Sequence, residues 1–323
     1  MSCRGKATKE TKKGEVKRLI SSFGRDKPIV LPFVKKDLRL PVAVRAGRRN
    51  SISGVQSKVL LAFEDGKFKL VESGGDFILK PVPEDSEARF AADIPANEHV
   101  TMQLASKVFG IATADNACVR FADGELAYLT RRFDRRDGRS IRQEDLCQVA
   151  GRSEDTHGSS YKYDFSYEEM AEIIRAVCPS ARVESPKVFK QIVFDYLFGN
   201  GDAHLKNFSV YESALGDYVM TPAYDLLSTF LHYPNDLTFM ALSFFKDPDF
   251  MTKEFETLGY YSLPDFILLG RAYGVAAQDV IKLLEDVRQK VPMVEDFVRD
   301  SLLTTEAQTE YLRIFHDRLR MFA

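Results

Sequence analysis

The pattern of hydrophobic residues changes once along this chain of 323 residues, near residue 136. Before that point, short runs rich in β-branched and aromatic residues alternate with Asp-Gly turns, which is typical of antiparallel strands. Beyond it, apolar residues recur every three or four positions, which predicts amphipathic helices. The order of the two patterns predicts an α+β protein with two lobes, a small β-rich lobe at 51–136 and a larger, mainly helical lobe at 137–323.

The first lobe is expected to be a mostly antiparallel sheet with one helix. Its predicted elements are a hairpin at 57–71 turning at Asp65-Gly66, a strand at 76–81 closed by Pro81, a helix at 95–109, and a hairpin at 117–135 turning at Asp123-Gly124.

The second lobe contains several helical patterns and one pair of strands. Ser166 and Glu169 form a capping box, which predicts a helix start. Further helices are expected at 186–199, 263–275, 277–299 and 305–322, with Pro264 and Pro292 as starts or breaks, and a β-turn-β at 208–222.

Residues 1–50 form a basic arm at the start of the small lobe. They contain 15 Lys and Arg against 4 Asp and Glu, although the whole chain has a formal net charge of -2, so the other residues carry a net charge of -13. The arm is either a solvated tail that folds back on the acidic body or a docking element for an acidic protein or nucleic acid. It has no helix-turn-helix or zinc-finger pattern, so DNA binding by the arm alone is not favoured.

No apolar run approaches the roughly 18 residues of a membrane helix, and the polar start is not typical of a secretory signal. The four cysteines have no metal-binding spacing. A protein of a reducing cytoplasm without membrane contacts is therefore expected.

The run "GNGDAHLKN" places Asp202 five residues before Asn207, and Asp225 follows in "TPAYDLL". Transfer of a phosphoryl group from ATP needs a base for the acceptor hydroxyl, oxygen ligands for Mg²⁺ and a cation on the phosphates. Protein kinases use Asp-x4-Asn and a later Asp for the first two tasks. The spacing alone is a weak signal, because it occurs by chance in many chains.

The first lobe supplies the other parts in the expected order. Lys80 lies in the predicted strand "FILKP", where a kinase places its phosphate-binding lysine, and Glu98 lies on the following helix, suitably placed to pair with it. The strand "LAYLT", with Tyr128 and Leu129, is expected to offer backbone groups to adenine as a hinge.

Some parts of an ordinary protein kinase are absent from the sequence. There is no G-x-G-x-x-G before Lys80, only "SISGVQSK" with one glycine. Asp225 is followed by two leucines instead of Phe-Gly, and no Ala-Pro-Glu occurs. An ordinary eukaryotic-type protein kinase is therefore not expected.

The segments "SISGVQSK", "FILKP", "NEHVTMQLA", "RRFDR", "QEDLCQVAG", "GDAHLKNFSV" and "TPAYDLLS" resemble the HipA-like serine/threonine kinases of bacterial toxin-antitoxin systems. The resemblance runs from about Ser51 to Thr229. It implies a two-lobed protein-kinase-like fold that uses ATP and Mg²⁺.

The resemblance also implies roles for individual residues. Asp202 matches the catalytic aspartate, Asn207 and Asp225 match the Mg²⁺ ligands, and Lys80 matches the nucleotide-phosphate lysine. Ser51 matches the inhibitory autophosphorylation serine of the family. The loop residues implied to contact ATP are Ser51, Ser53, Gly54, Gln56 and Lys58.

Several neighbouring residues have two interpretations. Ser53 is a second candidate for autophosphorylation, or both serines bind ATP unmodified. Lys206 either screens charge on the transferred phosphoryl group or is a solvated lysine. His204 is expected to hold the loop by a hydrogen bond, and Tyr161 to Tyr163 are expected to border the groove for the protein substrate.

Only fifty residues precede Ser51, which is similar to the short HipT branch of the family. That likeness implies a HipS-like small partner and a HipB-like DNA-binding antitoxin, with DNA contacted only through the antitoxin. The implied substrate is an aminoacyl-tRNA synthetase, tryptophanyl or glutamyl, whose inhibition stops translation. A small-molecule kinase of the aminoglycoside type and an inactive ATP-binding regulator remain open alternatives.

Overall fold

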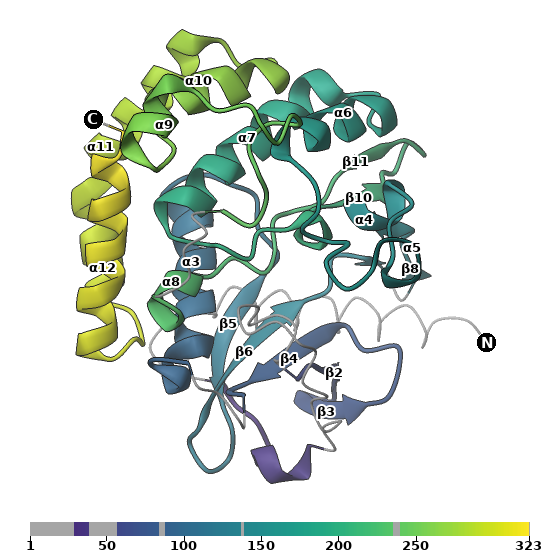
Figure 1. Ribbon diagram of the computed structural model, residues 1–323. Coiled ribbons are helices and arrows are strands. Elements are labelled where there is room, and N and C mark those ends of the chain that lie inside the picture. Colours follow the sequence, from purple (N-terminus) through teal and green to yellow (C-terminus); the bar gives the residue numbers. More distant parts are fainter. Residues whose placement is uncertain (1–28, 39–56, 84–87, 137–138, 235–239, 323) are drawn as a thin grey trace.

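The computed structural model describes residues 29–38, 57–83, 88–136, 139–234 and 240–322, which form a β-rich lobe and a helical lobe (Figure 1). The small lobe contains a six-stranded sheet in the order β1-β5-β6-β4-β2-β3. Its strands are β1 (Ile29–Val30), β2 (Val59–Glu64), β3 (Lys67–Val71), β4 (Phe77–Pro81), β5 (Asn116–Arg120) and β6 (Leu126–Arg131). All neighbouring strands are antiparallel except β1 and β5.

Two Asp-Gly turns form the hairpins of this sheet. Asp65 and Gly66 have φ angles of 53° and 74°, the left-handed pair that a two-residue hairpin requires. Residues 121–125 join β5 to β6, with Gly124 at φ 93°. Both predicted hairpins and the strand that ends at Pro81 are confirmed.

The two faces of the sheet have different partners. Leu79 and Leu129 face a small apolar cluster on the outer side. Lys80 and Tyr128, which pair with each other across β4 and β6, lie on the opposite face. Because side chains alternate along a strand, this register turns Lys80 towards the helix that covers the inner face.

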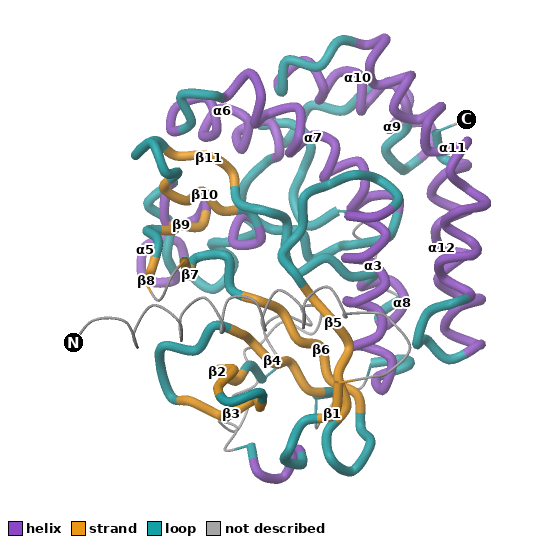
Figure 2. Tube along the Cα trace, turned by 180° about the vertical axis from the view of Figure 1, so that it is seen from behind, coloured by secondary structure: helices purple, strands orange, loops and turns teal. Residues whose placement is uncertain are grey.

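That helix is α3 (Ile94–Lys107), which confirms the expected helix at 95–109 with slightly different ends. Pro95 lies in its first turn, where the missing N–H costs nothing, and Val100 and Leu104 are buried. The helix packs against β5 and β6, and α12 lies beyond it in both views (Figures 1 and 2). A short 3-10 helix, η2 (Ala91–Asp93), precedes it.

Part of the basic arm belongs to the small lobe. Residues 29–38 contain β1 and the 3-10 helix η1 (Lys35–Asp37). Leu31 and Leu38 are buried in the outer cluster, and the Lys35 ammonium lies 3.0 Å from the Glu125 carboxylate. This segment is therefore packed on the sheet and is not a solvated tail.

The large lobe consists mainly of helices. They are α4 (Leu146–Val149), α5 (Glu154–His157), α6 (Tyr167–Val177), α7 (Ala181–Leu197), α8 (Thr229–His232), α9 (Lys253–Leu258), α10 (Leu263–Ala272), α11 (Ala277–Arg299) and α12 (Thr305–Arg320). Two small sheets lie beside them, formed by β9 (Gln143–Asp145), β10 (Ser209–Glu212) and β11 (Tyr218–Met220), and by β7 (Arg135–Arg136) and β8 (Arg139–Ser140).

Most of the predicted helix starts are confirmed. The Ser166 hydroxyl accepts a hydrogen bond from the Glu169 backbone and caps α6, and Pro264 lies in the first turn of α10. Pro186 and Pro292, however, lie inside α7 and α11. The predicted start of α7 at 186 and the predicted break at 292 are wrong, because burial of the apolar face continues each helix past the one hydrogen bond that a proline removes.

None of the helices within the described ranges is long and apolar enough to cross a membrane.

Candidate active site

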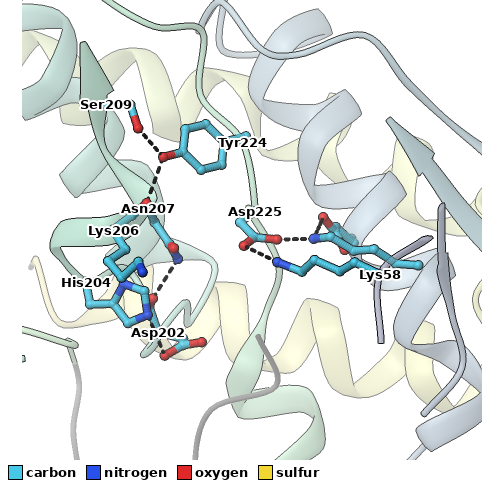
Figure 3. A network of polar contacts seen from close by, with 10 residues as sticks. Lys58, Asp202, His204, Lys206, Asn207, Ser209, Tyr224 and Asp225 are labelled. Carbon is cyan, nitrogen blue, oxygen red and sulfur yellow. Dashed lines mark hydrogen bonds and ion pairs between the residues drawn. The ribbon is translucent and has the colours of Figure 1, made fainter. Parts of the chain in front are cut away.

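The Lys80 side chain joins the two lobes at the inner face of the sheet. Its ammonium lies 2.5 Å from Glu98 Oε1 on α3. It also contacts Oδ1 of Asp225, a residue that follows β11 in the chain. All three residues are buried. The expected pair between Lys80 and Glu98 is confirmed, and Asp225 from the second lobe completes the cluster. Figure 3 shows Asp225 with the Lys58 ammonium beside it.

This cluster contains two carboxylates, of Glu98 and Asp225, and one ammonium, of Lys80. Burial alone would lower the pKa of Lys80, but the carboxylates of Asp225 and Glu98 outweigh burial and hold that pKa above its ordinary value. Burial raises the pKa of Glu98 to about 7, opposed by Lys80. Lys58 adds an ammonium 3.6 Å from Asp225 Oδ2. The buried Lys80 therefore forms ion pairs with two carboxylates, and the partly exposed Lys58 forms an additional ion pair with Asp225.

Asp225 has an unusual backbone conformation. Its φ angle of 60° lies in the left-handed region, which costs an L residue about 1 kcal/mol. The preceding Tyr224 donates a hydrogen bond from its hydroxyl to the carbonyl of Lys206 at 2.7 Å and contacts the Ser209 hydroxyl at 2.5 Å. Backbone strain of this kind is concentrated at functional sites, and here it turns the carboxylate towards Lys80.

Residues 199–208 carry Asp202 and Asn207 and are called the catalytic loop after the role that the sequence predicts for them. A hydrogen bond between these two residues closes the loop. Asn207 Nδ2 donates a hydrogen bond of 2.8 Å to the backbone carbonyl of Asp202. The 3-10 helix η3 (Leu205–Asn207) forms the return of the loop. The five-residue spacing between Asp202 and Asn207 thus has a structural reason, because it lets the amide bind back to the aspartate backbone.

The Asp202 carboxylate is contacted by two side chains of its own lobe, Tyr163 and His204. The Tyr163 hydroxyl donates a hydrogen bond of 2.6 Å to Asp202 Oδ1. His204 Nε2 lies 3.7 Å from the same oxygen, and its ring packs edge-on against Tyr163 at 5.0 Å between centroids. Asp202 and His204 are both buried.

His204 does not make the hydrogen bond that we expected. Neither ring nitrogen has a hydrogen-bond partner among the described residues. Burial and the nearby charge of Lys162 lower the pKa of His204 to about 3, so the ring is neutral. It stabilises the loop by packing against Tyr163 instead.

The residues present fit Mg²⁺, which prefers oxygen ligands and keeps several of its waters. Asn207 offers its amide oxygen, because its Nδ2 is used by the Asp202 carbonyl, and Asp225 offers a carboxylate. Among the described side chains, no group of three or more His, Cys, Asp and Glu could hold a metal ion. Asn207 and Asp225 thus supply two candidate oxygen donors.

Tyr128 and Leu129 do not fit the predicted hinge. The backbone of both residues pairs with β4 on one side and β5 on the other, and Leu129 faces the outer cluster. Backbone groups in the middle of a sheet are already bonded, so adenine contacts are expected from the chain that leaves the end of β6. Tyr128 instead places its ring 5.4 Å from the Lys80 ammonium.

The remaining predicted residues lie at the edge of the site or outside the described ranges. Lys206 is exposed, 3.3 Å from the Tyr161 hydroxyl and 4.0 Å from an Asp145 oxygen. Lys58 reaches Asp225. Ser51, Ser53, Gly54 and Gln56 lie outside the described residues, and their roles stay predictions.

Sequence reasoning missed the functions of Tyr163 and Tyr224. Each uses its hydroxyl to hold the loop or the strand that carries a candidate site residue. Tyr224 directly precedes Asp225, which is the one local signal that could have identified it. Tyr163 is 39 residues from Asp202, and nothing in the local sequence indicates that contact.

A cavity of about 420 Å³ lies behind the catalytic loop. Asn207 and Ser209 line one side of it, and Lys187 and Gln191 of α7 line another. Lys80, Asp202 and Asp225 are not among the described residues that line it, so the cavity borders the candidate site at Asn207.

Comparison with known proteins assigns a family to the chain. The sequence profile of the HipA-like C-terminal domain matches residues 50–294. A Haemophilus influenzae protein named as a kinase is 29% identical over 305 residues, covering 90% of this chain and 87% of that protein. The serine/threonine-protein kinase toxin HipA of Shewanella oneidensis is 29% identical over 220 residues, covering 62% of this chain and 48% of HipA. This chain thus spans about half the length of that toxin.

Two solved structures share the fold. One is the Shewanella oneidensis complex of HipA, HipB and operator DNA, with a TM-score of 0.65 and 22% identity, covering 89% of this chain and 68% of the matched chain. The other is the Helicobacter pylori proinflammatory kinase CtkA, with a TM-score of 0.54 and 12% identity, covering 83% and 90%. These likenesses confirm the two-lobed, kinase-like α+β fold.

Proposed function

This chain belongs to the HipA-like C-terminal domain family, and from that premise we propose that it is a protein kinase that uses MgATP to phosphorylate serine or threonine. One observation carries the proposal. Lys80 of the sheet binds Glu98 of α3 and Asp225 of the large lobe in one buried cluster. Phosphoryl transfer needs a phosphate-binding cation and a metal-binding carboxylate in contact with the same nucleotide.

The proposed roles follow from the chemistry of each group. Lys80 binds the phosphates of ATP, and Glu98 holds Lys80 in place. Asp202 orients the acceptor hydroxyl and accepts its proton. Asn207 and Asp225 hold Mg²⁺, which when bound neutralises charge on the phosphates.

We further propose that the kinase is the toxin of a toxin-antitoxin pair. The relative from Shewanella oneidensis is named as a toxin, and its structure was determined with HipB and operator DNA. This supports a HipB-like DNA-binding antitoxin as a partner. A HipS-like partner and an aminoacyl-tRNA synthetase as substrate stay predictions.

Autophosphorylation is part of the same proposal. Ser51 and Ser53 precede Lys58, whose ammonium lies 3.6 Å from Asp225. A phosphate on either serine would add about -1.5 to -2 charges to the sequence just before Lys58. The phosphate would compete with those of ATP for the same lysines.

The test is transfer of label from γ-labelled MgATP into a bacterial lysate. We expect the wild-type protein to label a protein band of synthetase size, or itself, and Asp202→Asn to label neither. Small alcohols and aminoglycosides, added as alternative acceptors, should not be labelled. Transfer to those acceptors alone would assign a small-molecule kinase, and labelling that persists in Asp202→Asn would overturn the role of Asp202.

A further inference from the structure

Three consecutive residues, Tyr161 to Tyr163, lie along the catalytic loop. The backbone N–H of Leu205 donates to the carbonyl of Lys162 at 3.3 Å, and the Tyr163 hydroxyl binds Asp202. The backbone contact and the tyrosine therefore fix the position of residue 162 relative to the catalytic carboxylate. The Lys162 side chain takes no part in the Leu205 contact.

Transfer of a phosphoryl group requires positive charge at the transferred group, close to the base. Other side chains near Asp202 are poor sources of it. Lys80 has the separate task of binding the ATP phosphates in the proposed function, and its charge is shared with Glu98 and Asp225. Lys206 is exposed and directed to the Tyr161 hydroxyl. His204, beside Asp202, is neutral because burial lowers its pKa to about 3.

Lys162 has the position and the charge that the reaction requires. Its ammonium lies 4.9 Å from the centre of the Tyr163 ring, and the hydroxyl of that ring binds Asp202. Lys162 interacts electrostatically with Asp202, the proposed base, and with Asp225, the proposed metal ligand. Burial lowers its pKa, because the ammonium has lost part of its solvation, and an anionic ligand would restore favourable interactions.

We infer that Lys162 is a catalytic residue that contacts the γ-phosphoryl group of ATP during its transfer. The inference rests on the proposed kinase function and adds one residue to it. The oxygen of the substrate hydroxyl forms a bond to the γ-phosphorus, and the bond from that phosphorus to the β,γ-bridging oxygen breaks. The hydroxyl proton passes to the Asp202 carboxylate, and ADP leaves with the bridging oxygen. The Lys162 ammonium stabilises the negatively charged oxygens of the γ-phosphoryl group while this group passes from ATP to the substrate hydroxyl.

The experiment compares Lys162→Met with Lys162→Arg in the full chain, using labelled MgATP. Loss of one transition-state contact of this kind lowers kcat by about 10²-fold or more. We expect that loss in Lys162→Met, with the affinity for ADP changed less than threefold, about the effect of one weak contact. Lys162→Arg should recover most of kcat, since it keeps the charge. Binding of ADP with magnesium and aluminium fluoride, which imitates the transferred group, should weaken in Lys162→Met by a factor similar to the loss of kcat.

Lys190→Met is the matched control, because Lys190 is another partly buried lysine whose pKa burial lowers, and it lies on α7 beside the rear cavity. It should keep kcat within threefold of wild type. A wild-type protein that transfers no label to any acceptor would overturn the proposed function and this inference together. An active wild type with an unimpaired Lys162→Met would overturn the inference alone. Equal loss in the Met and Arg variants, with unchanged binding of the fluoride complex, would also overturn it, because a structural role would explain both.

Discussion

The hydroxyl of Tyr163 donates a hydrogen bond of 2.6 Å to Oδ1 of the Asp202 carboxylate. A hydrogen bond to a charged group contributes about 1.5–3 kcal/mol, and it favours the ionised form of the carboxylate. The other oxygen, Oδ2, is not part of this bond. Under the proposed function, Tyr163 is therefore a positioning residue that holds the Asp202 carboxylate in one orientation.

Tyr163→Phe tests this role. We expect kcat to fall about tenfold, the equivalent of roughly 1.4 kcal/mol, with the KM for ATP nearly unchanged. Because the ionised carboxylate loses a donor, the acidic limb of the kcat profile should move to higher pH. Steady-state kinetics between pH 5 and 8 measure both effects. Tyr218→Phe, at a half-buried tyrosine on β11, is the control, and an unmoved acidic limb in Tyr163→Phe would contradict the role.

The sequence predicted contacts between candidate site residues where the residues lie in neighbouring elements. The contact between Lys80 and Glu98 followed from a strand and the helix after it. The second carboxylate on Lys80 could not be predicted, because Asp225 is 145 residues away and only tertiary packing brings it there. The hinge assignment of Tyr128 and Leu129 was wrong because both residues lie in a strand that is paired on both sides. A sequence does not show whether a strand lies at the edge or in the middle of a sheet.

At the scale of elements, the catalytic loop depends on how α7 ends. Gly199 follows the helix with a φ angle of 65°, which closes the helix in the left-handed conformation that favours glycine. A Cβ atom at this position would lie 3.0 Å from Ile314 of α12 and 3.1 Å from Phe230 of α8. The direction in which the chain enters the catalytic loop is thus set by backbone conformation and by close packing together.

Gly199→Ala and Gly274→Ala separate these two effects. Gly274 follows α10 with a φ angle of 72°, and a Cβ there would meet nothing within 4 Å. We expect Gly274→Ala to lower the free energy of unfolding by about 1–2 kcal/mol, the cost of a left-handed residue. Gly199→Ala should lower it by about 1–3 kcal/mol more, the cost of overpacking. Urea denaturation measures both, and equal losses would show that α8 and α12 do not constrain the loop.

Elements with local signals were predicted correctly, and elements without them were not. The capping box at Ser166 and the Asp-Gly turns carry their own chemistry, and both are confirmed. Strands β1 and β9 were missed because they have two and three residues, too few for a hydrophobic pattern. Each is stabilised by backbone pairing with a longer strand, β1 with β5 and β9 with β10.

At the scale of the whole molecule, a buried polar network on α3 connects the lobes. Asn97 Nδ2 donates to the Ser228 carbonyl and to His232 Nε2, both at 2.8 Å. His232 Nδ1 must carry the proton, since it lies 2.8 Å from the carbonyl of Arg89. This arrangement requires a neutral imidazole, and burial lowers the pKa of His232 to about 4.

The network predicts a pH dependence of stability. The folded-state pKa of His232 lies below its ordinary value of 6.5, so the unfolded chain binds the proton more readily. The contribution of His232 is therefore fully present above pH 6.5 and is lost as the pH falls towards 4, by about 3 kcal/mol in total. His232→Gln should be less stable than wild type at pH 7.5, and the difference should shrink as the pH falls through this window.

Chemical denaturation at a series of pH values measures that difference. The exposed His157, replaced by Gln, provides the control and should follow the wild-type curve throughout. A difference between wild type and His232→Gln that stays constant from pH 7.5 to 4.5 would show that the histidine is not held neutral. The lobes would then be joined by the other contacts of Asn97.

The placement of β1 has a practical consequence for the design of shortened versions of the protein. The family match begins at residue 50, yet residues 29–38 bury Leu31 and Leu38 in the small lobe. Within this stretch the Leu31 N–H also binds the Arg120 carbonyl at 2.7 Å. A protein trimmed to the matched residues 50–294 would expose this apolar surface and an open sheet edge, both of which promote aggregation. A truncation intended to remove the basic charge should therefore stop before residue 29.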